Sequence, residues 1–302
     1  ITPYRSSYPN AWVNIAYGCN NFCTYCIVPY VRGRERSRLP ENVVDEVKNL
    51  VNEGYKEITL LGQNVNSYGH DLKNDVGFAS LLDEIGKIEG KFRLRFMSNH
   101  PKDLTEDVIE AIKRNPHACH AIHLPVQSGS NRILSLMNRR YSVEKYLSQI
   151  ESIRKIIPDC AITTDIIVGF PTETEEDFID TVKLVETVKF DGAFTFVYSK
   201  REGTKAAIMD GQIDPEIQKD RIMRLIDVQN ELNRKESLTY VGKTVEILVE
   251  DFDEKKNSYM GRDERGKMAY FSCDENVIGK FVNVKITSAG GMSLMGEIIE
   301  IL

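Results

Sequence analysis

The sequence predicts an α/β domain followed by a small all-β domain. Up to about residue 236, short apolar strand-like segments alternate six times with amphipathic helix-like segments. Beyond residue 237 the apolar segments are short, rich in β-branched residues and separated by turns, and no helical period is visible. Six strand–helix units in a row predict a parallel sheet with helices outside it, as a barrel or as an open sheet.

The elements of the first domain follow one another regularly. The predicted strands cover residues 12–17, 57–61, 92–96, 121–126, 161–168 and 192–197. The predicted helices cover residues 41–53, 79–88, 105–114, 143–157, 175–188 and 215–235. Gly54 follows the first helix where a C-cap is expected. Thr105 and Thr174 precede acidic first turns and resemble N-caps, since carboxylates there complement the helix dipole.

The second domain is predicted as a small β-barrel. Its candidate strands cover residues 243–249, 258–261, 268–271, 280–287 and 293–301. We therefore divide the chain into residues 1–10, 11–236 and 237–302. The first segment carries Pro3, Ser6, Ser7 and Pro9, and we interpret it as a linker left from an absent N-terminal domain.

Composition excludes several classes of protein. Hydrophobic residues make up 41% of the chain and charged residues 28%, which is typical of a globular protein with a real core. The net charge of −6 argues against a globally basic nucleic-acid binder, although local basic patches remain possible. No apolar run is long enough to span a bilayer, and no signal-peptide core begins the chain. We expect a cytoplasmic protein without a membrane partner.

Three cysteines lie within eight residues, directly after the first predicted strand. Cys19, Cys23 and Cys26 have the spacing C-x3-C-x2-C, and the nearest histidine in sequence is His70. Structural zinc sites usually take four ligands. Three thiolates on one loop can instead hold three irons of a [4Fe–4S] cube and leave the fourth iron open. A zinc site completed by a distant ligand, or simply buried cysteines, are the alternatives.

Polar turns follow three other predicted strands, at the edge where α/β folds place their functional groups. Gln63 and Asn64 follow the second strand, Gln127 and Ser128 follow the fourth, and Gly169 follows the fifth. Small and amide residues allow close approach to a ligand and offer hydrogen-bond donors and acceptors. The alternatives are an ordinary polar turn and a helix cap formed by the residues after Ser128.

In this order, the motifs resemble the methylthiotransferase branch of the radical S-adenosylmethionine (SAM) family. The cysteine motif includes an aromatic residue, Tyr25, before its third cysteine. The other motifs are GQNVNSYG at residues 62–69, LPVQSGS at 124–130 and VGFPTETEEDF at 168–178. The last domain resembles the TRAM module, an RNA-binding β-barrel. The resemblance covers essentially the whole chain.

The resemblance implies a partial (β/α)6 radical SAM barrel followed by a small TRAM-like barrel. It also implies a [4Fe–4S] cluster on Cys19, Cys23 and Cys26, whose open iron chelates the amino and carboxylate groups of SAM. The residues expected at SAM are Tyr25, Gln63, Asn64, Gln127, Ser128, Asp165, Val168 and Gly169. Gln63 and Asn64 stand where the family commonly has the acidic residue of a Gly-Gly-Glu stretch.

The GQNVNSYG motif resembles the corresponding segment of the enzymes that convert N6-isopentenyladenosine beside the tRNA anticodon to its 2-methylthio form. SAM there serves both as methyl donor and as source of a 5′-deoxyadenosyl radical. A second, auxiliary [4Fe–4S] cluster is expected only in the absent N-terminal domain, so we expect this chain to bind one cluster without completing thiomethylation. The alternative substrates are threonylcarbamoyl-adenosine in tRNA and a ribosomal-protein aspartate. An alternative of another class is a non-catalytic, zinc-containing RNA-binding protein.

The expected partners are tRNA and an electron donor such as flavodoxin or ferredoxin, and we expect a monomer. Arg32, Arg34, Arg36 and Arg38 are predicted to contact phosphates near the mouth of the site. The alternative interpretation is that these arginines lie on a solvated loop and pair with Glu35 and Glu41. The predicted β-barrel is acidic, so RNA contact there needs a local patch. Its candidates are Lys255, Lys256, Arg262, Arg265 and Lys267.

Overall fold

A curved parallel sheet forms the first part of the computed structural model, which describes residues 7–73 and 76–302. The predicted linker therefore lies partly outside the described residues. β1 (Asn10–Asn14), β4 (Glu57–Leu61) and β5 (Arg93–Phe96) form one parallel sheet. A second parallel sheet contains β6 (Ala121–His123), β7 (Ala161–Val168) and β8 (Gly192–Val197). The two sheets are joined by a bridge between Leu94 and Ala118.

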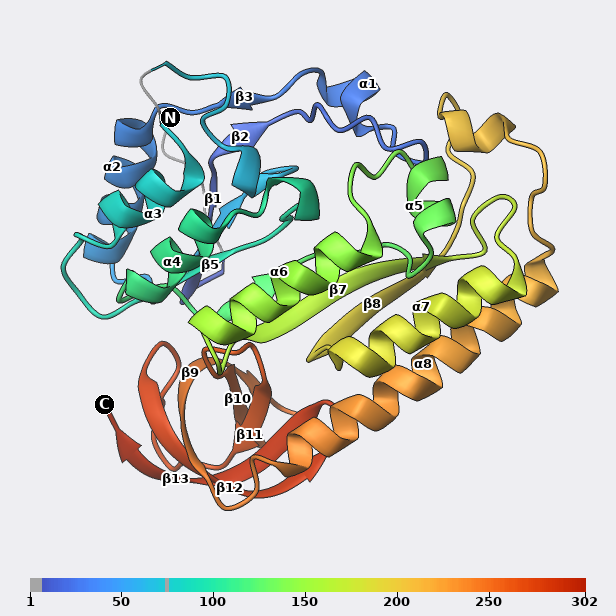
Figure 1. The fold of residues 1–302 in the computed structure, drawn as a ribbon. Helices are drawn as coiled ribbons and strands as arrows, with labels where there is room; N and C mark the ends of the chain where they lie inside the picture. Colours follow the sequence, from blue (N-terminus) through green and yellow to red (C-terminus); the bar gives the residue numbers. More distant parts are fainter. Residues whose placement is uncertain (1–6, 74–75) are drawn as a thin grey trace.

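These six strands form a half-barrel that is covered on its outer face by helices (Figure 1). The helices are α2 (Pro40–Asn52), α3 (Phe78–Ile85), α4 (Glu106–Arg114), α6 (Val143–Ile156), α7 (Glu175–Val188) and α8 (Pro215–Leu238). The side chains of β7 alternate between the two faces of the sheet. Ile166 and Val168 are buried in the core under the helices, while Asp165 and Ile167 face the other side. The partial α/β barrel predicted from the sequence is thus confirmed.

The structure differs from the prediction at several short elements. The first predicted strand is broken, because Ala16 leaves β1 and pairs with Ser37, so that β2 (Ala16–Tyr17) and β3 (Arg36–Ser37) form a small antiparallel ladder. β6 ends before Pro125, which has no N–H for a ladder. The short helices were not predicted. They are α1 (Val28–Arg32), α5 (Asn131–Leu136), η1 (Val65–Ser67), η2 (Pro101–Asp103) and η3 (Lys205–Ile208).

The C-terminal part is a closed barrel with its own core, as the sequence predicts. Its strands are β9 (Thr244–Asp253), β10 (Ser258–Arg262), β11 (Met268–Phe271), β12 (Phe281–Gly290) and β13 (Ser293–Ile301). They pair in the order β10-β11-β13-β12-β9, and Phe271 and Val284 are among the residues buried inside. α8 leads directly into this barrel (Figure 1).

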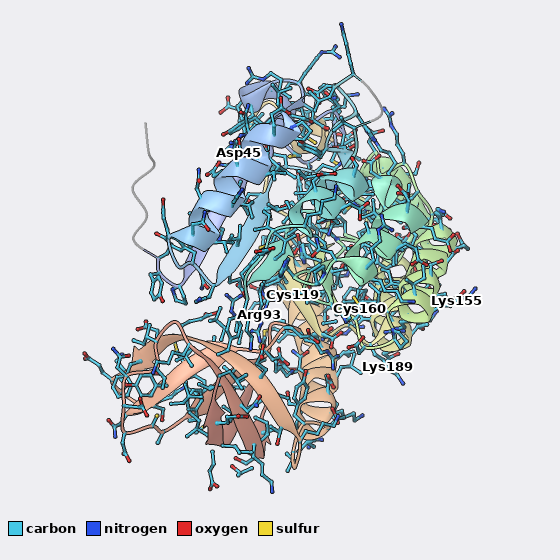
Figure 2. The ribbon with its side chains drawn as sticks, turned by 90° about the vertical axis from the view of Figure 1, so that its left-hand side faces the viewer. Asp45, Arg93, Cys119, Lys155, Cys160 and Lys189 are labelled. Carbon is cyan, nitrogen blue, oxygen red and sulfur yellow. The ribbon has the colours of Figure 1, made fainter. Side chains whose placement is uncertain are left out.

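The closed barrel docks against the amino ends of the half-barrel strands. Glu57, the first residue of β4, is buried and accepts hydrogen bonds from Arg95 Nε at 2.7 Å and Arg262 Nη2 at 2.9 Å. Arg93, the first residue of β5, donates to the backbone carbonyls of Arg262 and Glu246. Figure 2 shows Arg93 between the two parts. The closed barrel therefore lies away from the carboxyl ends of the strands.

This docking corrects the candidate RNA patch on the closed barrel. Arg262 pairs with Glu57 and Arg265 pairs with Asp191 at 2.6 Å, so both guanidinium groups face the half-barrel. Burial lowers the pKa of Lys267. Lys255 and Lys256 remain exposed.

The described part of the chain contains no helix long and apolar enough to cross a membrane.

Candidate functional site

The three clustered cysteines lie on one loop between β2 and α1, at the carboxyl end of the half-barrel. Gly18 opens the loop with φ +78°, and a Cβ there would lie 2.2 Å from the carbonyl oxygen of Arg34. The Cys19 N–H donates to Gly33 O at 3.2 Å. The loop therefore needs glycine at position 18 because its backbone lies directly against residues 33–34.

The other end of the cysteine loop is held by α5. Thr24 N–H donates to the carbonyl of Met137 at 3.1 Å, and the Thr24 hydroxyl donates to the carbonyl of Leu136 at 2.9 Å. The amide of Asn138 donates to the carbonyl of Phe22 at 2.9 Å. These contacts join segments more than a hundred residues apart, so no local sequence pattern indicates them.

Three cysteine sulfurs from one loop are available as ligands at this site. Structural zinc sites usually take four protein ligands. Thiolate ligands alone suit an iron–sulfur cluster.

Burial raises the pKa of Cys19 and of Cys26, and the neighbouring thiols raise both further. Cys23 is the most buried of the three. Uptake of a metal group by these thiols would therefore release protons, since the thiolate is the form that ligates a metal. All six cysteines are free, which fits a metal-binding role for the clustered three and not a disulfide framework.

A cavity of about 290 Å³ opens beside the cysteine loop and brings three predicted cofactor residues together. It is lined by Tyr25, Gln127, Asp165, Ile167, Phe196, Val197, Tyr198, Ser199 and Arg201. Gln127 has φ +71°, and its N–H donates to the carbonyl of Asp165 at 2.8 Å, so the turn after β6 is fixed to β7. The prediction that Tyr25, Gln127 and Asp165 contact a cofactor is consistent with this placement.

Buried polar atoms without a hydrogen-bond partner gather at the same edge of the half-barrel. Among the described side chains they include Gln63 Oε1, Asn64 Oδ1, Asn66 Nδ2, Asn99 Oδ1, His100 Nε2 and Tyr198 Oη. Proteins rarely leave such atoms unpaired, so each calls for an explanation. An amino acid joined to a nucleoside offers amino, carboxylate and hydroxyl groups to these atoms, and the site fits SAM in this respect.

Three other predicted cofactor residues have side chains or backbone engaged elsewhere. The Ser128 hydroxyl is fully buried and lies 3.4 Å from the Thr181 hydroxyl, while Ser130 caps α5. Val168 packs in the main core. Gly169 has φ +70° and packs against the side chain of Gln218 in α8, which donates to its carbonyl at 3.0 Å. None of these three lines the cavity.

The predicted arginine run divides into two kinds of residue. Arg32, Arg34 and Arg36 are exposed on and after α1. Arg38 is engaged, since its guanidinium pairs with Glu46 at 2.7 Å and donates to the carbonyl of Asn14. Glu35 is buried and points away from solvent, so it is not the exposed partner that the alternative interpretation assumed.

The inner face of the half-barrel carries aromatic and apolar side chains below the cysteine loop. Phe194 and Phe196 of β8 align with Asp165 and Ile167 of β7, and both rings are more than half exposed. On the opposite side, Trp12 of β1 aligns with Thr59 of β4. His123 adds a polar group, with Nε2 3.4 Å from Asp165 and its ring packed edge-on against Phe194. Apart from Asp165, the sequence analysis did not single out these residues, because each has the character of an ordinary strand residue.

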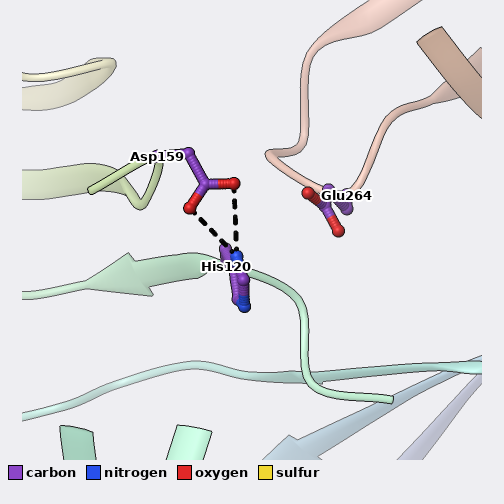
Figure 3. Close-up of side chains that lie close together, drawn as sticks. All are labelled: His120, Asp159 and Glu264. Carbon is purple, nitrogen blue, oxygen red and sulfur yellow. Dashed lines mark hydrogen bonds and ion pairs between the residues drawn. The ribbon is translucent and has the colours of Figure 1, made fainter. Parts of the chain in front are cut away.

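A second group of metal-ligand side chains lies at the seam with the closed barrel. The ligand atoms of His120, Asp159 and Glu264 lie within 4.8 Å of one another, and His120 Nδ1 is 3.2 Å from Asp159 (Figure 3). Both carboxylates are exposed, as acidic groups without a metal commonly are. We assign no metal to this group.

Comparison with known proteins agrees with these observations. The Radical SAM superfamily profile matches residues 13–185, and the TRAM domain profile matches residues 238–299. The chain is 54% identical over 299 residues to a protein from Thermoanaerobacter pseudethanolicus named tRNA-2-methylthio-N(6)-dimethylallyladenosine synthase. A protein of the same name from Clostridium botulinum is 56% identical over 294 residues. These matches cover 99% and 97% of this chain but only 64% and 65% of the relatives' length.

Solved structures show the same fold at low sequence identity. Coproporphyrinogen III oxidase (HemN) from Escherichia coli, a radical SAM enzyme, superposes with a TM-score of 0.57 at 16% identity, covering 93% of this chain and 68% of that one. The radical SAM methyltransferase TsrM from Kitasatospora setae gives a TM-score of 0.56 at 18% identity, covering 66% and 38%. The profile match spans more than half of the chain, so the chain belongs to the radical SAM superfamily, whose cofactors are a [4Fe–4S] cluster and SAM, and it carries a TRAM domain.

Proposed function

We propose that this chain is the radical SAM and TRAM part of a tRNA methylthiotransferase that acts on N6-isopentenyladenosine beside the anticodon. The observation that carries the proposal is the identity of 54–56% with relatives named for that reaction, over 97–99% of this chain. Dimethylallyl, the word in their name, denotes the same five-carbon group. The relatives are longer than this chain, so the complete activity is proposed for the whole protein.

Cys19, Cys23 and Cys26 would hold the [4Fe–4S] cluster, which supplies an electron for the reductive cleavage of SAM. The residues of this chain that would bind SAM are those at the cavity, Tyr25, Gln127 and Asp165, together with the unpaired amide oxygens of Gln63 and Asn64. Because these groups lie on one edge, SAM would be held beside the cysteine loop and above the inner face. Buried amides there shield a reactive intermediate from water.

The inner face supports a prenylated adenine as substrate. Phe196 lines the cavity and Phe194 lies two positions away in the same strand, and burial of such apolar surface stabilises an isopentenyl group by about 25 cal/mol per Å². A threonylcarbamoyl group carries a carboxylate and a hydroxyl, which would require polar partners. The exposed Arg32, Arg34 and Arg36 near the cysteine loop would contact tRNA phosphates.

The proposal includes a cytoplasmic location, where tRNA and reduced thiols occur together. It also includes a flavodoxin or ferredoxin as electron donor and a monomeric protein. The TRAM barrel lies at the amino ends of the strands, so a tRNA bound to both parts would extend along the side of the half-barrel.

The test makes two measurements on the anaerobically reconstituted chain. The first is SAM cleavage, measured as 5′-deoxyadenosine release, and the second is the binding of three anticodon stem-loops. We expect binding of the isopentenylated stem-loop to exceed that of the unmodified and threonylcarbamoylated ones, and Phe194→Ala to reduce this preference about tenfold. Ile299→Ala, an equally exposed apolar position on the closed barrel, is the control. Equal binding of all three stem-loops would contradict the substrate assignment.

A further inference from the structure

We propose that Arg139 is a positioning residue that serves as the counterion of the Cys23 thiolate and raises the reduction potential of the cluster bound there. The inference rests on the cluster assignment but not on the identity of the substrate. Arg139 lies in the turn after α5, which sequence analysis did not single out.

The guanidinium of Arg139 is buried directly behind the cysteine loop. The residue is 7% exposed, and its Nη1 lies 3.5 Å from Cys23 Sγ. Nη2 donates to the carbonyl of Pro125 at 2.8 Å, and Nε donates to the hydroxyl oxygen of Tyr141 at 2.9 Å. The guanidinium also lies over the Tyr141 ring, 5.2 Å from its centroid. Its donors are thus directed to two neutral oxygens and one sulfur.

The charge of Arg139 has no carboxylate partner among the described residues that interact with it. The titratable groups that interact with its charge are Cys23, Cys26, Tyr25, Tyr141, Tyr146 and His100. Burial raises the pKa of Tyr141, so this phenol stays neutral. His100 packs edge-on against Tyr141, and burial, Arg139 and Lys102 together lower its pKa to about 2. Burial likewise raises the pKa of Tyr25 and of Tyr146, so the cysteine sulfurs are the groups that can supply the negative charge, and Cys23 Sγ is the one in contact with Arg139.

A buried cation without an anion is strongly unfavourable, whereas a paired one is tolerated. An arginine keeps its proton at every physiological pH. Ligation to iron makes Cys23 a thiolate and gives Arg139 its anion. The arrangement is therefore explained by a cluster in the site, and a neutral thiol would leave the guanidinium uncompensated.

The backbone holds Arg139 in this place independently of the sulfur. Its N–H donates to the carbonyl of Leu134 at 2.8 Å, and Asn138 before it has φ +58°. The Asn138 amide donates to the Phe22 carbonyl, one residue from Cys23. The cysteine loop and the arginine are thus fixed to each other before any metal binds.

A fixed positive charge beside a ligating sulfur stabilises the added electron of a reduced cluster. Net charge and hydrogen bonds to sulfur are two of the factors that set iron–sulfur potentials. Removal of the charge at residue 139 should therefore make the cluster harder to reduce.

The test is a spectroelectrochemical titration of the anaerobically reconstituted chain without SAM. At a fixed applied potential, we expect Arg139→Gln to lower the ratio of reduced to oxidised cluster at least tenfold, which corresponds to 59 mV for one electron. Arg139→Lys keeps the charge and should lie between Arg139→Gln and the wild type. Arg140→Gln removes the same charge from the exposed neighbouring position and should titrate like the wild type.

Equal titration of Arg139→Gln, Arg140→Gln and the wild type would overturn the proposal. If Arg139→Gln binds too little iron to titrate, Tyr141→Phe decides, because it removes only the hydroxyl that accepts from Nε. A shift to lower potential in Tyr141→Phe supports the role of Arg139, and an unchanged potential contradicts it. Uptake of zinc in place of iron by the wild type would instead refute the cluster assignment.

Discussion

Substitution of Gly18 by alanine tests how the cysteine loop is held. Gly18 has φ +78°, and a left-handed backbone costs a non-glycine residue about 1–2 kcal/mol. In addition, the new Cβ would lie 2.2 Å from Arg34 O and 2.6 Å from Gly33 O, so the backbone has to move. Such overpacking costs typically about 1–3 kcal/mol. We expect a total loss of roughly 2–5 kcal/mol in the free energy of unfolding.

The displacement should also remove the metal group. Cys19 follows Gly18 directly, and its N–H bond to Gly33 O, 3.2 Å long, is broken when the loop moves away. We expect Gly18→Ala to retain much less iron than the wild type after anaerobic reconstitution, and to release little 5′-deoxyadenosine from SAM. The measurements are iron and sulfide per chain, together with urea denaturation.

Gly54→Ala is the matched control for this prediction. Gly54 has φ +94° at the end of α2, but a Cβ there meets nothing within 4 Å. It therefore carries the backbone strain without the collision, and we expect about 1–2 kcal/mol of destabilisation with normal iron content. If both variants bind iron like the wild type and lose equal stability, the close approach of residues 33–34 does not position the loop.

Three further predictions concern the domain seam, acid stability and metal content. Glu57→Gln should destabilise the protein by about 3 kcal/mol in urea denaturation, because it leaves buried Arg95 without its carboxylate. Glu84→Gln, which breaks the exposed pair with Lys87, should lower the free energy of unfolding by less than about 1 kcal/mol. Equal losses of stability in the Glu57 and Glu84 variants would contradict this prediction. Asp177 is buried, which by itself raises its pKa, but hydrogen bonds from Arg132 and Ser130 outweigh this and hold the pKa well below the usual value. Its contribution is therefore present above about pH 4 and lost as the pH falls through the lowered value, so Asp177→Asn should be about 1.5–3 kcal/mol less stable than the wild type at pH 7, with a gap that narrows below pH 4. The reconstituted chain should hold about four irons, and about eight would show a second cluster.

The local features of the site could be predicted from the sequence because they depend on neighbours in the chain. The spacing of Cys19, Cys23 and Cys26 within one loop, and its place after a strand, are both local. The alternation of strands and helices has a clear period, and parallel strands joined by helices bring their carboxyl ends to one edge. This is why Tyr25, Gln127 and Asp165 could be expected near one another, and they line one cavity.

Side-chain direction after a turn was less predictable. Ser128 and Gly169 lie in the predicted loops, but contacts with α7 and α8 turn them toward helices. Such contacts join residues about fifty positions apart, and the sequence of either loop alone does not indicate them. In the same way, the sequence does not distinguish Arg38 from the three arginines before it, whereas in the structure Arg38 forms an ion pair with Glu46.

The sequence by itself determined the fold class, the two-part organisation and the clustering of the three candidate thiol ligands, because periodicity and short spacing express local geometry. Only the tertiary structure decided which charges are paired. It placed Arg262 and Arg265 at the seam, and it placed Arg139 3.5 Å from a sulfur 116 residues earlier in the chain. The physical reason is that the energy of a charge depends on its burial and its partners, and both arise only when distant segments pack together.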